Sequence, residues 1–452
     1  MMNEHISREL IDQVIDEFTR GQPQSALDFI AEYHPADIAL LMSYLDEELF
    51  PDFIALLEED KAAQVVVELD DPYRELLLRH LTAEELAPIV DDMESDEAAD
   101  VVQDLTQVDE EAAEELLQRL GDEQRDEVDR LLEYDEDSAG GIMAVEFVAV
   151  NINLTVDDAI REIRRQRDCA DRYYQVFVVD DNYRLVGHIA LQDLVMADDS
   201  TPLLELVEKE VLKVTPDTDQ ERVAYLAQKY DLITVAVVDD QDHLLGRITP
   251  DDILDVMQEE AAEDLAAMAG TGQQEVSDLS SPRIARQRLP WLIFGLGGGI
   301  CAAWIMSVFE HSLYTMMHVA FFVPVVIAMG GNIGIQSSSI VVRSLALEEE
   351  LLRQIPRRLW VELKVSIINA LILSVLLFGA IYLWQRNLLE AFAIAGSLVV
   401  VIVFAAFVGT LSPLVLEKLN IDPALATGPF ITISNDVTGL LIYLFITTRL
   451  LL

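Results

Sequence analysis

The chain has 452 residues and a formal net charge of −51, with 81 acidic against 30 basic residues. A chain of this length is expected to form more than one domain. The charge argues against nucleic acid as a partner, because phosphate neutralisation requires clustered Lys and Arg. Two interpretations of the acidity stay open. One is a solvated, salt-adapted surface, and the other is a set of carboxylate clusters that bind divalent cations.

The acidity is confined to the first part of the chain. Residues 281–452 contain 11 Lys and Arg against 9 Asp and Glu, so the negative charge precedes residue 281. The polar start MMNEHISREL lacks the apolar stretch of a signal peptide. We therefore expect the first half of the chain to lie in the cytoplasm.

Residues 1–133 are expected to form an acidic, all-α domain of the helical-repeat type. Short stretches with apolar faces alternate there with Asp and Pro breaks. Asp96 and Asp100 fall four residues apart on one helix face, where like charges repel. Either solvation or a bound cation would relieve that repulsion.

Residues 134–256 contain an internal repeat. The stretch VFVVDDNYRLVGHIALQDLV from Val176 is echoed by VAVVDDQDHLLGRITPDDIL from Val235, an offset of 59 residues. Each copy has the pattern of a strand, a turn, a second strand and a helix. The repeated motif resembles the CBS domain, an α/β module that occurs as tandem pairs.

CBS pairs often bind adenine nucleotides through a hydroxyl residue followed by an Asp three positions later. Thr249 and Asp252 match this pattern in the second copy, whereas Ala190 precedes Asp193 in the first. The resemblance therefore implies at most one complete site of this type, with ATP as its candidate ligand.

An acidic connecting helix is expected over residues 257–285. On a continuous helix, Asp252, Asp255, Glu259 and Glu263 form one stripe, and Glu260 and Asp264 lie beside it. The stripe is either solvated or bridged to acidic neighbours by divalent cations. Carboxylates without imidazole or thiolate ligands favour hard ions, Mg²⁺ above all in a cytoplasm.

Residues 286–452 predict a transmembrane domain of five helices. The apolar stretches long enough to cross about 30 Å of hydrocarbon are Leu289–Phe309, Val319–Val342, Val365–Trp384, Phe392–Val415 and Leu425–Thr448. Lys and Arg gather in alternate connections, which places the N-terminus inside and the C-terminus outside. The sequence as a whole thus predicts a multidomain membrane protein.

Polar residues interrupt the second and fifth predicted spans. The second contains MGGNIGIQSSS from Met329, and the fifth places Asp436 inside an apolar run. A carboxylate in hydrocarbon is costly and marks a functional site by default, and here it would attract cations. Thr432, Asp436 and Gly439 share one helix face, as a pore wall requires. A two-fold axis would bring two copies of Asp436 to one pore, so we expect a homodimer.

Over nearly its whole length the chain resembles the MgtE family of bacterial magnesium channels. The motifs that carry the resemblance are YDEDSAGGIM from Tyr134, EEAAEDL from Glu259, PVVIAMGGNIGIQSSSIVVRSLA from Pro324 and DPALATGPFITISNDVTGLLIY from Asp422. The resemblance implies a homodimeric, Mg²⁺-selective channel in the bacterial plasma (inner) membrane. Its pore would be lined by the second and fifth transmembrane helices.

The resemblance also assigns roles to individual residues. Asp436 matches the pore aspartate, which would hold a hydrated Mg²⁺ through its water shell. The other expected pore-lining residues are Asn332, Gly428, Pro429, Thr432, Asn435 and Gly439. Cytosolic carboxylates bridged by Mg²⁺ would keep the connecting helix as a plug over the pore, and they fall on Asp96, Asp100, Asp219, Glu221, Asp231, Asp252, Asp255, Glu260, Glu263, Asp264 and Asp422.

The expected function is therefore Mg²⁺ uptake through a channel that cytosolic Mg²⁺ closes. An enzyme is not expected, because the soluble half has no nucleophile–base constellation and no phosphate-binding Gly loop. Three alternatives stay open. They are a nucleotide-regulated transporter of another divalent cation, a Na⁺-coupled Mg²⁺ exchanger, and a membrane sensor that transports nothing.

Overall fold

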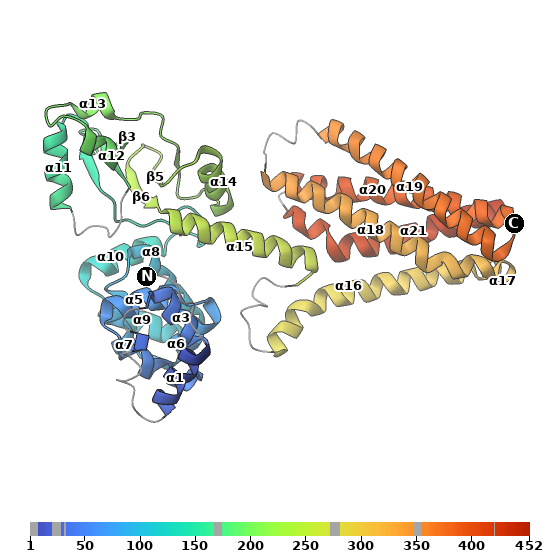
Figure 1. Ribbon diagram of the computed structural model, residues 1–452, viewed down its shortest axis with the longest axis horizontal. Helices are drawn as coiled ribbons and strands as arrows, with labels where there is room; N and C mark the ends of the chain where they lie inside the picture. The colour runs from blue at the N-terminus through green and yellow to red at the C-terminus, as the bar shows by residue number, and fades with distance from the viewer. Residues whose placement is uncertain are drawn as a thin grey trace. The chain divides into compact units, whose positions relative to one another are not determined.

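The computed structural model describes residues 8–19, 29–30, 33–166, 174–271, 281–347, 355–419 and 421–452. The chain divides into two compact units, Met1–Gln258 and Glu259–Leu452 (Figure 1). Each unit has its own apolar core. The division falls inside one helix, α15 (Pro250–Ala269).

Short helices make up the first part of the first unit, as predicted for an all-α domain. They are α1 (Arg8–Thr19), α3 (Pro35–Met42), η1 (Glu47–Leu49), α4 (Phe50–Ile54), α5 (Glu59–Val67), α6 (Asp71–His80), α7 (Ala83–Val90), α8 (Ser95–Val108), α9 (Glu110–Arg119) and α10 (Asp122–Leu131). Local chemistry sets their boundaries. Thr82 and Glu85 form a capping box at the start of α7, and the Asp109 carboxylate caps α9. Phe50, Phe53 and Leu77 lie in the core that the helices share.

The predicted repeat is confirmed as two modules of the same topology. The elements are β1 (Ala149–Asn151), α11 (Val156–Arg165), β2 (Gln175–Val179), β3 (Leu185–Ala190), α12 (Leu191–Met196), α13 (Leu203–Leu206), β4 (Lys213–Val214), α14 (Gln220–Tyr230), β5 (Val235–Val238), β6 (Leu244–Ile248) and α15. Each sheet joins a parallel pair to an antiparallel pair, in the orders β1-β2-β3 and β4-β5-β6. The register shifts after Val178 in one sheet and after Val237 in the other.

The two modules differ in the helix that follows their last strand. In the first module α12 has 6 residues, whereas in the second α15 has 20. The Thr249 backbone N–H donates to Asp252 Oδ2 at 2.9 Å, which caps the start of α15. The first module has Ala190 at the position of Thr249, and the described start of α12 has no side-chain cap hydrogen bond.

The second unit holds the five predicted membrane spans. Its helices are α16 (Ser281–Val308), α17 (Glu310–Thr315), α18 (Met317–Leu347), α19 (Ile355–Gln385), α20 (Leu388–Lys418), η4 (Pro423–Ala426) and α21 (Gly428–Leu451). Within the described part of the chain, five helices are long and apolar enough to cross a membrane. They extend beyond the spans expected from hydropathy. Helix α20 packs against α18, α19 and α21, and α16 packs against α21.

Small residues bring three of these helices into close contact. A Cβ at Gly409 of α20 would lie 2.4 Å from the carbonyl oxygen of Gly334 in α18, and one at Gly334 would lie 2.2 Å from Asn435 Nδ2 in α21. Real Cβ atoms do not approach so closely, so Gly409 cannot carry a side chain without moving the α18 backbone, and a side chain at Gly334 would displace Asn435. The contact holds the two polar helices, α18 and α21, against one another.

Candidate functional site

The first candidate site is the polar surface of α18 and α21. Asn332 and Gln336, one turn apart on α18, are exposed, and Thr432 and Asp436, one turn apart on α21, are partly exposed. Within the described ranges, Asp436 has neither a hydrogen-bond nor an ion-pair partner. An ionised carboxylate inside an apolar helix costs free energy that a nearby cation would recover. The arrangement can therefore attract cations.

Two of the expected pore-lining residues are enclosed by helix contacts of the single chain. Asn435 is 2% exposed, and its Nδ2 donates to the Gly330 carbonyl oxygen of α18 at 3.4 Å. Gly439 is buried against α20, where an added Cβ would lie 3.3 Å from Val401. Asn435 thus joins α18 to α21, and contact of either residue with an ion stays a prediction.

The end of α15 lies against the start of α21 within the second unit. A Cβ at Gly428 would come within 2.0 Å of the Met268 carbonyl oxygen, and one at Gly270 within 2.6 Å of Pro429 Cγ. Gly428 and Gly270 have φ values of +39° and +69°, which side chains disfavour. Both glycines are therefore required by close approach and by backbone conformation. Gly428 is one of the residues expected to line the pore, and the structure gives it this packing role.

Two predicted regulatory carboxylates come together near the same contact. Burial and the negative charge of Asp422 raise the pKa of Asp264 on α15. Asp422 caps η4, where its Oδ1 accepts from the Ala424 N–H at 2.7 Å. Glu260 and Glu263 precede Asp264 on the same helix. The acidic residues at the end of α15 therefore lie near a second carboxylate, that of Asp422.

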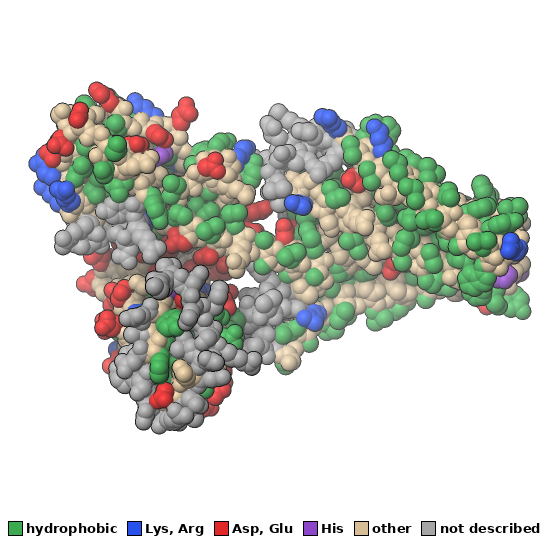
Figure 2. All heavy atoms as spheres, viewed as in Figure 1, with side chains coloured by type: hydrophobic (Ala, Val, Ile, Leu, Met, Phe, Trp, Pro, Cys, Tyr) green, Lys and Arg blue, Asp and Glu red, His purple; other side chains and the backbone are tan. Residues whose placement is uncertain are grey.

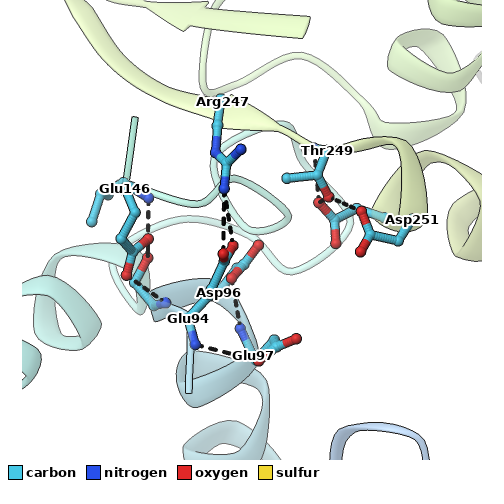
Figure 3. Close-up of polar contacts among 10 residues, drawn as sticks. Glu94, Asp96, Glu97, Glu146, Arg247, Thr249 and Asp251 are labelled. Atoms are coloured by element: carbon cyan, nitrogen blue, oxygen red, sulfur yellow. Dashed lines mark hydrogen bonds and ion pairs between the residues drawn. The ribbon is translucent and has the colours of Figure 1, made fainter. Parts of the chain in front are cut away.

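A second acidic site joins α8 to the two repeated modules (Figure 3). Arg247 of β6 donates from Nη2 to both carboxylate oxygens of Glu94, at 3.2 and 3.4 Å, and its side chain is only 7% exposed. Ser95 donates to the Glu146 carboxylate from its backbone N–H at 2.9 Å and from its hydroxyl at 2.7 Å. These two pairs attach the first turn of α8 to the segment before β1 and to β6.

Asp96 and Asp252 lie near enough at this junction for the charge of one to act on the other. Asp96 is 6% exposed, and burial followed by the negative charge of Asp252 raises its pKa well above the ordinary value. Burial also raises the pKa of Asp252 to about 6 and that of Glu97 to about 7. Asp255, one turn further along α15, has a raised pKa for the same reason. A proton or a cation at the junction would relieve this repulsion.

The other predicted regulatory carboxylates lie elsewhere. Asp100 lies one turn after Asp96, near Arg74. Asp219 caps α14 and accepts from the backbone N–H of Glu221 at 3.0 Å, while Asp231 ends the same helix. Over the described ranges, no three Asp, Glu, His or Cys side chains form a metal-binding group.

Several residues of the α8 junction were missed by sequence reasoning. They are Glu94, Glu97, Glu146, Arg247 and Asp251. Glu94 and Arg247 are 153 positions apart, and their contact follows from tertiary packing alone. One signal was available: Arg247 is a basic residue at the repeat position held by His188 in the first module, within a strongly acidic half of the chain.

The residues predicted to bind a nucleotide are also part of this junction. The Thr249 hydroxyl donates to Asp251 and Asp252, and the Thr249 backbone N–H donates to Asp252. Thr249 is buried. The carboxylate predicted for a ribose is thus the same one whose charge acts on Asp96, so the two predicted roles of Asp252 compete for one group.

Comparison with known proteins identifies each part of the chain. Residues 33–137 match the MgtE intracellular N domain, residues 139–200 and 204–259 match the CBS domain, and residues 323–446 match the divalent cation transporter family MgtE. The magnesium transporter MgtE of Thermus thermophilus is 35% identical over 434 residues, which cover 96% of each chain. The chain belongs to the MgtE family of magnesium transporters.

Further relatives agree. The magnesium transporter MgtE of Bacillus subtilis is 32% identical over 440 residues, 97% of each chain, and that of Enterococcus faecalis is 37% identical over 321 residues, 71% of each chain. Two solved structures resemble the soluble half. The cytosolic domain of the Mg²⁺ channel MgtE in complex with ATP is 34% identical, with a TM-score of 0.52 over 54% of this chain and 99% of that one. The soluble part of a magnesium transporter is 30% identical, with a TM-score of 0.50 over 56% and 98%.

Membership of the MgtE family confirms several expectations. The chain is a membrane protein of a transporter family, not an enzyme, and its N domain is intracellular. The predicted helical domain, CBS pair and five-helix membrane domain are those of the family as matched along the chain.

Proposed function

We propose that this chain is a Mg²⁺-selective channel for Mg²⁺ uptake across the bacterial plasma (inner) membrane, closed by cytosolic Mg²⁺. One observation carries the proposal: α15 meets an opposing carboxylate near each end, Asp252 with Asp96 and Asp264 with Asp422. A divalent cation between the members of each pair would replace repulsion by attraction. Since Mg²⁺ would then bind the closed state more tightly than the open one, rising cytosolic Mg²⁺ would close the channel.

The donor atoms suit Mg²⁺. The ion dehydrates reluctantly, keeps several waters, and is usually bound in proteins by one or two carboxylates. Such pairs of Asp residues supply that number without imidazole or thiolate, which favours hard ions. Glu260 and Glu263 would strengthen the field at the Asp264 pair. The remaining proposed regulatory carboxylates would act around these pairs, and they are Asp100, Asp219, Glu221, Asp231 and Asp255.

The proposed pore lies along the polar surfaces of α18 and α21. Asp436 would hold hydrated Mg²⁺, with Asn332 and Thr432 beside it, and the other proposed lining residues are Gly428, Pro429, Asn435 and Gly439. One carboxylate makes a sparse site, so we propose a homodimer in which a second copy supplies another Asp436. Five crossings from an intracellular N domain would place the C-terminus outside.

We further propose that the CBS pair binds ATP, with Thr249 and Asp252 as candidate ligands. Support comes from a relative at 34% identity whose cytosolic domain was crystallised with ATP. Since the charge of Asp252 also acts on Asp96, a nucleotide held by Asp252 would bear directly on the regulatory pair.

The proposed domains are residues 1–133, 134–256, 257–285 and 286–452. The third is the acidic connecting helix, which acts as the plug. Because α15 begins at Pro250, the plug is continuous with the second CBS module rather than joined to it by a loop.

The proposal is tested by Mg²⁺ entry into liposomes that hold the purified full-length protein, with Mg²⁺ varied on the side of the soluble domains. We expect flux to fall as that Mg²⁺ rises. Flux that ignores soluble-side Mg²⁺ would contradict the closing mechanism. Flux that requires a Na⁺ gradient would identify an exchanger, and the absence of flux from folded protein would contradict transport itself.

A further inference from the structure

An apolar groove lies between α19 and α20. Its volume is about 190 Å³, and it is lined by Leu359, Trp360, Leu363, Ala406, Phe407 and Thr410. Trp360 is 60% exposed and Phe407 is 51% exposed, and both lie on helices long enough to cross a membrane. The Thr410 hydroxyl already donates to the Ala406 carbonyl oxygen at 2.7 Å. The groove therefore offers apolar surface without an unsatisfied polar group.

Basic side chains accompany the groove on α19. Lys364 Nζ lies 5.5 Å from the ring centroid of Trp360, and Arg357 precedes Trp360 by three residues on the same helix. Both basic residues are exposed. On the face of the second unit seen in Figure 2, the blue basic side chains lie toward its ends, while green apolar side chains cover its middle.

The nearest acidic residue on α19 does not offset this charge. Glu362 follows Trp360 by two residues, which places it on nearly the opposite side of the helix. Its Oε2 accepts from the Ser337 hydroxyl of α18 at 3.5 Å. The groove is therefore bordered by Arg357 and Lys364, with the carboxylate turned toward another helix.

We propose that this groove binds an anionic phospholipid. One acyl chain lies along Trp360 and Phe407, and the phosphate is held by Arg357 and Lys364. Basic pockets between membrane helices recognise anionic headgroups, and long basic side chains extend along apolar surface to reach them. Trp360 lies where an aromatic ring is favoured, next to a charged group at the edge of the hydrocarbon.

Charge complementarity favours a lipid over a second copy of this chain. In a two-fold contact the same surface meets itself. If the two-fold axis passed through the groove, Arg357 and Lys364 of one copy would lie close to Arg357 and Lys364 of the other, and like charges brought together at a membrane surface repel. An anionic headgroup supplies the opposite charge instead.

The test is native mass spectrometry of the purified full-length protein titrated with phosphatidylglycerol or phosphatidylcholine. The wild type should retain phosphatidylglycerol preferentially. The double variant Arg357→Gln/Lys364→Gln should lose that preference, by roughly fivefold per removed charge. Arg449→Gln is the matched control, because Arg449 forms a similar cation–π contact with Phe445, at 5.6 Å, near the end of α21.

A second variant tests the apolar part of the site. Trp360→Ala should lower retention of phosphatidylglycerol while leaving both basic residues in place. Equal retention of the two lipids by the wild type, or unchanged preference in the double variant, would overturn the proposal. So would disulfide formation between copies of a Trp360→Cys variant, since that result identifies the groove as a contact between chains. None of these readouts depends on Mg²⁺ flux.

Discussion

Burial of the Asp96 carboxylate on α8, followed by the negative charge of Asp252 on α15, raises the pKa of Asp96 well above its ordinary value. Beside this pair, Arg247 bonds to Glu94. The junction between the N-terminal helices and the second CBS module thus holds the Arg247 guanidinium together with several carboxylates. The buried carboxylates at this junction repel one another, and a divalent cation or a proton bound there would relieve that repulsion.

Neutralising one member of the pair should weaken the response to Mg²⁺. Asp252→Asn keeps an oxygen that can cap α15 but removes a charge, so the Mg²⁺-free protein should unfold at a higher temperature than the wild type. If Mg²⁺ at 100 times its dissociation constant stabilises the wild type by about 2.7 kcal/mol, the variant should gain less than half of that. Thermal unfolding with and without Mg²⁺ measures both effects. Asp193→Asn, the exposed equivalent in the first module, should change neither.

Stability without Mg²⁺ should depend on pH. The folded-state pKa values of Asp252, about 6, and Glu97, about 7, lie above the ordinary values of Asp and Glu. Between roughly pH 4 and pH 7 the folded state therefore retains protons that the unfolded state has released. The free energy of unfolding should fall as pH rises through this window. Thermal unfolding in a chelator at pH 5.5 and pH 8 measures the change, and a larger stability at pH 8 would contradict the assignment.

Removal of the positive charge of Arg247 should destabilise the junction between α8 and the second module. Arg247→Met leaves the partly buried Glu94 without this ion-pair partner and should lower the free energy of unfolding by about 2 kcal/mol. Chemical denaturation of the full-length protein, followed by a spectroscopic signal from the first unit, measures the loss. Arg161→Met is the matched control, because Arg161 pairs with Asp157 and Asp158 at an exposed site. Its loss should cost about 0.5 kcal/mol, and equal losses would contradict a special role for Arg247.

Asp436 should be required for transport. Asp436→Asn removes the charge while keeping the side-chain size, and we expect Mg²⁺ flux in liposomes to fall at least about tenfold, the ratio that about 1.4 kcal/mol of lost binding produces. Glu310→Gln, which removes an exposed carboxylate from α17 between two spans, should leave the flux unchanged. Normal flux in the Asp436 variant would refute the pore assignment.

The contact between α15 and α21 should depend on Gly428. A methyl group there meets the Met268 carbonyl oxygen, and the positive φ adds about 1 kcal/mol of strain. Gly428→Ala should therefore displace the end of α15 and weaken closure of the channel by Mg²⁺ without abolishing flux. Gly299→Ala is the control, since a Cβ at Gly299 meets no atom within 4 Å. Wild-type closure in the Gly428 variant would show that the contact does not take part in gating.

The architecture was predictable because its signals are local. Hydrophobic periodicity indicates the short helices and the five spans, and the 59-residue offset indicates two modules of one topology. The surroundings of each functional side chain depend on contacts between residues far apart in the sequence, which local sequence patterns do not show. Arg247 reaches Glu94 across 153 positions. Asn435 shares an apolar helix with Asp436, yet it is enclosed because Gly334 lets α18 approach. The spacing of residues along a helix predicted which side chains share a face. The packing of the helices decided which of those side chains contact a second helix.

Because α15 is a single helix of 20 residues, the directions of its carboxylates relative to one another depend on the number of residues between them. A helix turns by about 100° per residue and rises about 1.5 Å, so Asp252 and Glu263 are about three turns apart and point in nearly the same direction. A single alanine inserted between Val256 and Glu259 would leave every carboxylate present and the helix intact. It would nevertheless rotate the acidic residues at the far end by about 100° relative to Asp252. In the proposed mechanism, the carboxylates of α15 act through one continuous helix, so a change in the length of α15 would disturb them more than a substitution that keeps its register.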